Sequence, residues 1–197
     1  MKKLCTSIFA VCLLAGCSTV KIHSWADPEI ESRKIGKTMV LGVAESDSLC
    51  REYEILFVDS LTEVGVDAHS FHALLQKADP VTEEVFAAAL QENGYDSIIV
   101  TRKLSEVDRQ QAVPVGYYPS YYGNYYGYYS HAFSLSYDTA YVQSFMEFEL
   151  ETNLYDVKTK KLVWTGRCTV YDDRTDRTNM KGVIKGIIKD LGEKGLL

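Results

Sequence analysis

The sequence contains no hydrophobic run long enough to cross a membrane. Its longest apolar stretch, residues 4–15, has about a dozen residues, whereas a membrane-spanning helix needs about 20. A retained transmembrane helix is therefore not expected. The stretch does have the length and position of the apolar region of a secretory signal peptide.

Positive charge is also scarce. Without residues 1–16, the chain carries 19 basic and 27 acidic side chains, a formal net charge of −8. A chain of this sign repels nucleic acid and anionic lipid headgroups, and no polybasic segment is there to hold it on a membrane. We therefore expect no nucleic-acid partner, and we expect membrane attachment to depend on a lipid.

No set of residues has the spacing of a catalytic or metal site. Gly36-Lys37-Thr38 lacks the preceding glycine of a phosphate-binding loop, because position 31 is Glu. His69 and His72 are three positions apart, and in a strand residues at that spacing point to opposite faces, so they are not expected to share a metal. No Ser-His-Asp or Cys-His arrangement is evident. We expect no catalytic residue, no metal and no cofactor.

The most informative residues present are Leu14-Ala15-Gly16-Cys17. With two lysines and the apolar stretch before them, they resemble the lipobox of bacterial lipoproteins. The resemblance implies a signal peptide over 1–16, cleavage between Gly16 and Cys17, and a palmitate-bearing lipid anchor on Cys17. Ser18 resembles an outer-membrane sorting signal, which implies an outer-membrane lipoprotein facing the periplasm. A plain cleaved signal peptide is the alternative, but it needs no cysteine here.

The rest of the chain divides into a tether and one domain. Residues 17–35 are polar and irregular and are expected to form a lipidated tether that leads to a first edge segment. Residues 36–197 are long enough for a single periplasmic domain with its own core. Short apolar runs predict three buried strands, separated by two helical patterns. The expected strands are 38–44, 66–71 and 97–101, and the expected helices are 49–64 and 79–92.

Near residues 147–151 the pattern changes, and charged residues alternate with apolar ones instead of forming apolar runs. Glu147, Glu149 and Glu151 share one face of an expected strand, the usual pattern of a solvated side. A turn leads to a returning strand over 162–170, where Arg167 faces the same side and can pair with one of the carboxylates. These two strands form an antiparallel hairpin.

An apolar stripe over 183–191 predicts a C-terminal helix. The expected fold class is therefore α/β: one mixed sheet, β-α-β-α-β, followed by an antiparallel β-hairpin and a C-terminal helix. Val40, Leu41 and the run 98–100 should be buried on both faces of the sheet. Cys50 and Cys168 fall at core positions, which favours small buried thiols, and a disulfide between them stays an alternative.

A tyrosine-rich segment, residues 115–130, interrupts this pattern. Eight of the 13 residues from 117 to 129 are tyrosine, with glycine and proline between them. We expect the segment to be exposed, too polar and glycine-rich to join the core. Aromatic faces suit contact with proteins or sugars, and a spacer without specific contacts is the alternative. The candidate partner-binding residues are Tyr117, Tyr118, Tyr121, Tyr122, Tyr125, Tyr126, Tyr128 and Tyr129.

Several of these features occur together in a known group. The lipobox, the segment 24–28 (SWADP), the tyrosine/glycine-rich segment and the hairpin sequence at 154–164 resemble small Gram-negative lipoproteins of unknown function. That group usually has glycine where Lys160 stands. The order of elements also resembles the N-terminal domain of TolB and the periplasmic part of the curli secretion lipoprotein CsgG, at the level of fold alone.

These observations favour a membrane-anchored, non-enzymatic lipoprotein whose domain acts by binding in envelope assembly or maintenance. The tyrosine-rich segment would contact an envelope protein or a glycan. Two alternatives stay open: a subunit of an oligomeric envelope or secretion complex, as in CsgG, and a periplasmic hydrolase that uses the acidic face.

Overall fold

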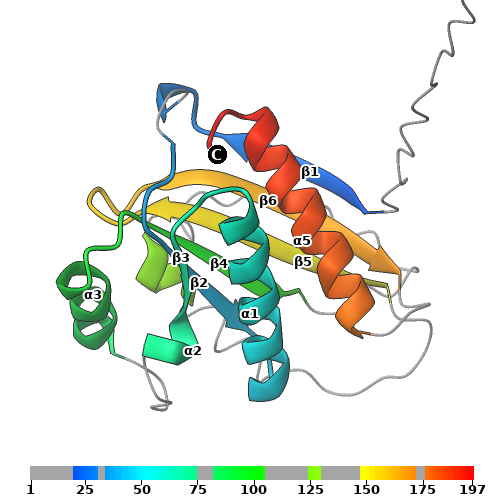
Figure 1. Ribbon diagram of the computed structural model, residues 1–197, viewed down its shortest axis with the longest axis horizontal. Helices are drawn as coiled ribbons and strands as arrows, with labels where there is room; N and C mark the ends of the chain where they lie inside the picture. The colour runs from blue at the N-terminus through cyan, green and yellow to red at the C-terminus, as the bar shows by residue number, and fades with distance from the viewer. Residues whose placement is uncertain (1–19, 31–33, 75–81, 105–123, 130–146, 172–175) are drawn as a thin grey trace, which may run out of the picture.

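A six-stranded mixed sheet is the framework of the protein in the computed structural model, which describes residues 20–30, 34–74, 82–104, 124–129, 147–171 and 176–197. The strand order is β1-β6-β5-β4-β2-β3 (Figure 1). The strands are β1 Lys21–Ala26, β2 Thr38–Val43, β3 Ala68–Ser70, β4 Ser97–Lys103, β5 Glu147–Asp156 and β6 Leu162–Tyr171. The helices are η1 Pro28–Ile30, α1 Asp47–Glu63, α2 Phe71–Leu74, α3 Glu83–Glu92 and α5 Asp176–Glu193. The expected α/β class is confirmed.

One half of the sheet is parallel, as the alternation of strands and helices predicted. Strand β2 pairs in parallel with both β3 and β4. Helix α1 begins after Ser46, whose side chain accepts a hydrogen bond from the N–H of Leu49, and it ends before Gly65 at φ 88°. Helix α3 begins at Glu83 with Thr82 as its N-cap, later than the Asp79-Pro80 start expected from the sequence. The Thr82 hydroxyl accepts the N–H of Val85 and so caps the first turn.

The other half is antiparallel. Strands β5 and β6 form the expected hairpin, with Glu151 opposite Arg167. Strand β1 adds to the outer edge of β6, with Lys21 opposite Thr169. This strand lies within the stretch expected to be a tether, so that expectation was wrong for 21–26. Alternate residues of β1 pack inward, a pattern that a six-residue polar segment shows only weakly.

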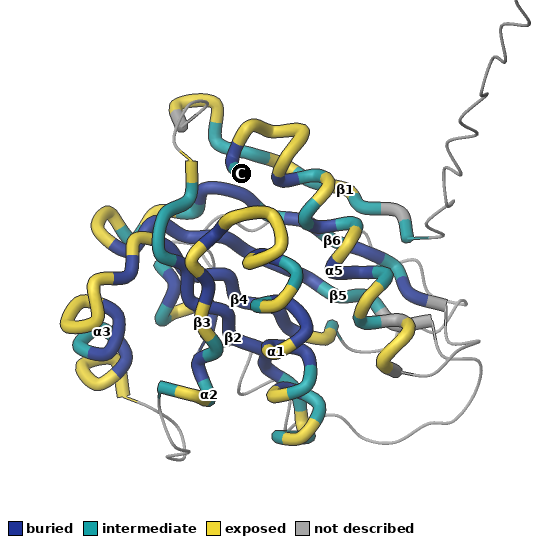
Figure 2. Tube along the Cα trace, in the orientation of Figure 1, coloured by how far each residue is buried: buried dark blue, intermediate teal, exposed yellow. Residues whose placement is uncertain are grey.

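Helices cover both faces of the sheet and enclose two apolar cores. Helices α1 and α5 pack on the first face, and α2, α3 and residues 125–129 pack on the second. The expected core positions are confirmed, because Val40, Leu41 and residues 98–100 are at most 2% exposed. Figure 2 shows the buried residues gathered in the central strands and the exposed ones on the outer sides of the helices. No described helix is both long and apolar enough to span a membrane.

The two cysteines of the domain are separate buried thiols. Cys50 on α1 and Cys168 on β6 are both free, so the disulfide alternative is wrong. Burial raises the pKa of Cys50 to about 11 and that of Cys168 to about 12. Both stay protonated at neutral pH, and a protonated thiol is a poor nucleophile.

The hairpin turn contains a left-handed residue. Lys160 has φ 60°, the one non-glycine residue in the described ranges with positive φ. Glycine adopts this backbone conformation without the steric cost that other residues incur. We therefore expect glycine at this position to be tolerated in the turn.

Candidate functional site

Four of the eight candidate tyrosines lie where the structure is described. Residues 125–129 form a short helical turn on the second face of the sheet. Tyr125, Tyr128 and Tyr129 are at most 6% exposed, and Tyr126 is half-buried. The expectation that the segment is too polar to join the core was therefore wrong for these three. Gly16, Cys17, Tyr117, Tyr118, Tyr121 and Tyr122 lie outside the described residues.

The spacing of the buried tyrosines explains why they pack. Positions 125, 128 and 129 are related as i, i+3 and i+4, so in a helical turn they share one face. Their rings meet two phenylalanines. The Phe86 ring stacks on Tyr125 with centroids 5.5 Å apart and lies 5.0 Å from the Tyr129 ring. Phe71 lies 5.2 Å from Phe86. The density of tyrosine and glycine obscured this helical spacing in the sequence.

Tyr128 reaches past this aromatic cluster to a buried carboxylate. Its hydroxyl donates to Oε2 of Glu151 at 3.0 Å and to the Glu151 carbonyl at 3.3 Å. Its ring faces the Arg102 guanidinium at 5.3 Å. Burial, and then the negative charge of Glu151, raise the pKa of Tyr128 well above 10. The phenol therefore stays protonated and remains a donor to the carboxylate.

Glu151 also binds two arginines from the neighbouring strands. Arg102 of β4 donates to Oε2 through Nε at 3.1 Å and Nη2 at 2.9 Å. Arg167 of β6 donates to Oε1 through Nε and Nη2, both at 2.7 Å. The Glu151 side chain is 1% exposed and that of Arg102 is 8% exposed. We call Glu151, Arg102, Arg167 and Tyr128 the Glu151 cluster (one carboxylate, two cations and a phenol).

The expectation that Glu147, Glu149 and Glu151 share a solvated face was wrong for Glu151. Glu151 is buried and Glu149 is half-buried, while the Glu147 side chain lies outside what is described. Strand β5 is central in the sheet, so its second face is covered rather than wet. The predicted pairing of Arg167 with one carboxylate of the row is confirmed, and the carboxylate is Glu151.

A second buried carboxylate, Glu54, was missed from the sequence. It lies on α1 and accepts four hydrogen bonds at 2.5–3.0 Å. The donors are the N–H of Gly42, the Ser70 hydroxyl, and both the N–H and Nδ1 of His72. Position 54 falls in phase with the buried residues 50, 53, 57 and 61 of the same helix. That phase was the signal available, because a charged residue on an apolar stripe needs internal partners.

His69 and His72 each have a carboxylate partner. His72 bonds to Glu54, and His69 lies 2.9 Å from the Asp67 carboxylate. The two side chains thus turn to different carboxylates. His72 lies on α2, so the strand geometry from which their opposite directions were expected does not apply. Within the described ranges, no three His, Cys, Asp or Glu side chains are grouped to hold a metal.

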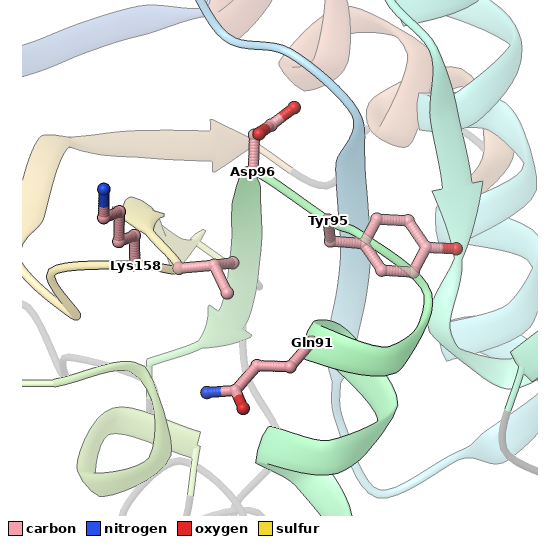
Figure 3. Close-up of a pocket in the computed structure, with 5 residues that line it drawn as sticks. Gln91, Tyr95, Asp96 and Lys158 are labelled. Atoms are coloured by element: carbon pink, nitrogen blue, oxygen red, sulfur yellow. The ribbon is translucent and has the colours of Figure 1, made fainter.

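A hollow of about 340 Å³ lies at the N-terminal end of β4. Gln91, Tyr95, Asp96, Val157 and Lys158 line it (Figure 3). The Asp96 carboxylate accepts the N–H of Lys37 at 2.9 Å. The side chain of Lys37 lies over the Tyr95 ring and donates to the Asn93 carbonyl. The backbone at 36–38 is thus already bound to a carboxylate of the chain itself.

Comparisons with known proteins give no family. No protein-family model matches the chain, and no curated protein matches it in sequence. Two solved PelC dodecamers from Paraburkholderia phytofirmans are similar in structure. The first has a TM-score of 0.49 and 10% identity, and the match covers 88% of this chain and 97% of that one. The second, a variant with a single substitution, has a TM-score of 0.46 and 13% identity, and the match covers 87% of this chain and 95% of that one. Lipoprotein GNA1162 from Neisseria meningitidis has a TM-score of 0.44 and 11% identity, covering 80% of this chain and 99% of its own. At these values the likenesses carry no argument about function.

We predict that Glu151→Gln lowers the free energy of unfolding by about 3–5 kcal/mol, because it leaves the buried Arg102 and the half-buried Arg167 without their carboxylate. Glu149→Gln, on the same face of the same strand, should change it by less than about 0.5 kcal/mol, since that side chain makes no ion pair with any residue that the structure describes. Urea unfolding of both variants measures the difference. Equal effects would mean that the Glu151 cluster does not stabilise the fold.

Proposed function

We propose that this protein is a lipid-anchored, non-enzymatic binding module of the bacterial envelope, held on the outer membrane and facing the periplasm. The observation that carries the proposal is the lipobox-like sequence at 14–17 after a positive and apolar leader. Two or more acyl chains give stable membrane anchoring, whereas one gives only marginal binding. A processed lipoprotein would therefore stay on the membrane.

The start of the fold supports the same proposal. Strand β1 begins at Lys21, four residues after Cys17. A chain spans at most about 3.5 Å per residue, so the sheet edge would lie within about 14 Å of the anchor. The domain would thus be held against the membrane surface rather than on a long tether.

The buried carboxylates favour binding over hydrolysis. Glu54 accepts four hydrogen bonds, and both oxygens of Glu151 are bound by arginine. A general acid or base has to reach the substrate proton that it transfers. The two carboxylates instead join elements of the fold, which argues against the hydrolase alternative.

The tyrosine-rich segment is the proposed contact surface. Tyr125, Tyr128 and Tyr129 would fix its C-terminal end to the sheet, and the half-buried Tyr126 lies beside them. Fixing one end lowers the entropy lost when the remaining tyrosines bind a partner. Aromatic faces with polar hydroxyl tips suit either an envelope protein or a glycan.

The anchor is tested by Cys17→Ser. We expect cells given labelled palmitate to label the parent protein and to leave this variant unlabelled, because the thiol that would be acylated is gone. Gel electrophoresis and autoradiography measure the label. The matched control is Cys50→Ser, which removes a thiol buried in the domain and should keep the label. Undiminished label in the Cys17 variant would overturn the proposed anchor.

The contact surface is tested by replacing Tyr117, Tyr118, Tyr121 and Tyr122 together with serine. In intact cells, a photoreactive amino acid at position 126 should crosslink the parent protein to its partner and should fail in this variant, because the aromatic contact area is lost. The melting temperature should stay nearly unchanged, since the buried tyrosines are retained.

The matched control for that experiment replaces the same four tyrosines with phenylalanine, which keeps the aromatic faces and should keep the crosslink. A crosslink that survives the serine replacement would make the segment a spacer. A crosslink to a second copy of the chain would favour the oligomeric alternative.

A further inference from the structure

The outer side of α5 carries a row of basic side chains. Arg177, Lys181, Lys185 and Lys189 follow one another at intervals of four, and all are exposed. Residues four apart lie on the same side of a helix. With a rise of 1.5 Å per residue, the row is about 18 Å long. We call these four residues the α5 basic stripe.

The middle of the α5 basic stripe pairs with no acidic side chain in the described part of the chain. Arg177 pairs with Glu52 at 2.8 Å, and Lys189 lies 3.7 Å from Glu193. Lys181 and Lys185 form no ion pair with any residue of the described ranges. The stripe is thus a local excess of positive charge on a chain that is acidic as a whole.

The stripe also lies next to the proposed lipid anchor. Gly186 of α5 lets β1 approach closely, because a Cβ there would lie 2.9 Å from the Ile22 side chain. A Cβ on Gly182 would lie 3.5 Å from Val20, the residue before β1, which is an ordinary contact distance. Figure 1 shows β1 running beside α5. Val20 follows Cys17 by three residues, so the two lie within about 10 Å of each other. The anchor would therefore hold α5 at the membrane surface.

We propose that the α5 basic stripe lies on the anionic phospholipid headgroups of the membrane that holds the Cys17 lipid. The inference rests on the proposed lipid anchor. Each lysine near an anionic surface strengthens binding about fivefold, and the anchor supplies the high local concentration that such a weak contact needs. The contact would fix the orientation of the domain, with α5 toward the lipid and the tyrosine-bearing face of the sheet away from it.

The test uses the acylated full-length protein in vesicles of phosphatidylcholine, with or without phosphatidylglycerol. A membrane-impermeant amine-reactive ester modifies exposed lysines, and mass spectrometry gives the rate at each position. We expect Lys181 and Lys185 to react about fivefold more slowly in the anionic vesicles, with the protection lost at high salt. Lys158 and Lys161 lie in the turn at the opposite end of β6 and should react equally in both.

A pair of double variants checks that charge is the cause. Lys181→Gln with Lys189→Gln leaves Lys185 as the reporter, and its protection should be largely lost. Lys158→Gln with Lys161→Gln removes the same charge from the distant turn and should leave Lys185 protected. All four side chains are at the surface, so the melting temperature should not change, and measuring it confirms that both variants fold.

The outcomes separate the docking from the anchor. If the protein floats with the vesicles and Lys185 reacts at the same rate in neutral and anionic vesicles, the proposed contact of the α5 basic stripe with lipid is overturned while the anchor stands. Protection in the neutral vesicles as well would also overturn it, because the contact would then be with a second copy or an uncharged surface. If the protein carries no lipid and does not float, the proposed anchor fails, and the docking that rests on it fails too.

Discussion

The carboxylate of Glu151 joins four separate segments of this fold. It lies on β5, binds an arginine from each neighbouring strand, and accepts the hydroxyl of Tyr128 from the turn at 125–129. Removing a carboxylate and two guanidiniums from water costs several kcal/mol per ion, and dense hydrogen bonding offsets that cost. The contacts therefore depend on one another. The Tyr128 hydroxyl adds a donor to this buried charge and so ties the tyrosine turn to the sheet.

This arrangement gives the two faces of the sheet different roles in our account. The first face holds α1 and α5, and β1 brings the proposed lipid attachment to the edge of that layer. The second face holds α2, α3 and the tyrosine turn, which is fixed by Glu151 and by the rings of Phe71 and Phe86. A membrane contact through α5 would leave the second face available to a partner. Anchoring and binding would then use opposite sides of one sheet.

Much of the framework could be predicted from the sequence. The buried strand at 98–100, the helix expected at 49–64 and the β5–β6 hairpin each have a strong local signal, because a single hydrophobic period decides them. The pairing of Arg167 with a carboxylate followed from strand alternation. Sequence alone could not tell that the face was covered, since burial of Glu151 depends on the turn at 125–129.

The features that could not be predicted from the sequence share a physical cause. Glu54 and the buried tyrosines are polar residues at apolar positions, and their partners come from distant parts of the chain. The net charge of the chain also concealed the α5 basic stripe, since lysines four apart in a helix gather into a patch that a count of charges does not reveal. Strand β1 was taken as tether because its inward residues gain their packing only when β6 and α5 are in place.

The most direct measurement of the central claim is a double-mutant cycle between Tyr128 and Glu151. The free energy of unfolding is measured for the parent chain, Tyr128→Phe, Glu151→Gln and the double variant. If the carboxylate holds the tyrosine turn on the sheet, the two changes should be coupled by about 1–3 kcal/mol, as expected for a buried hydrogen bond to a charged group. A coupling near zero would contradict the account, because the turn would then be held by its rings alone.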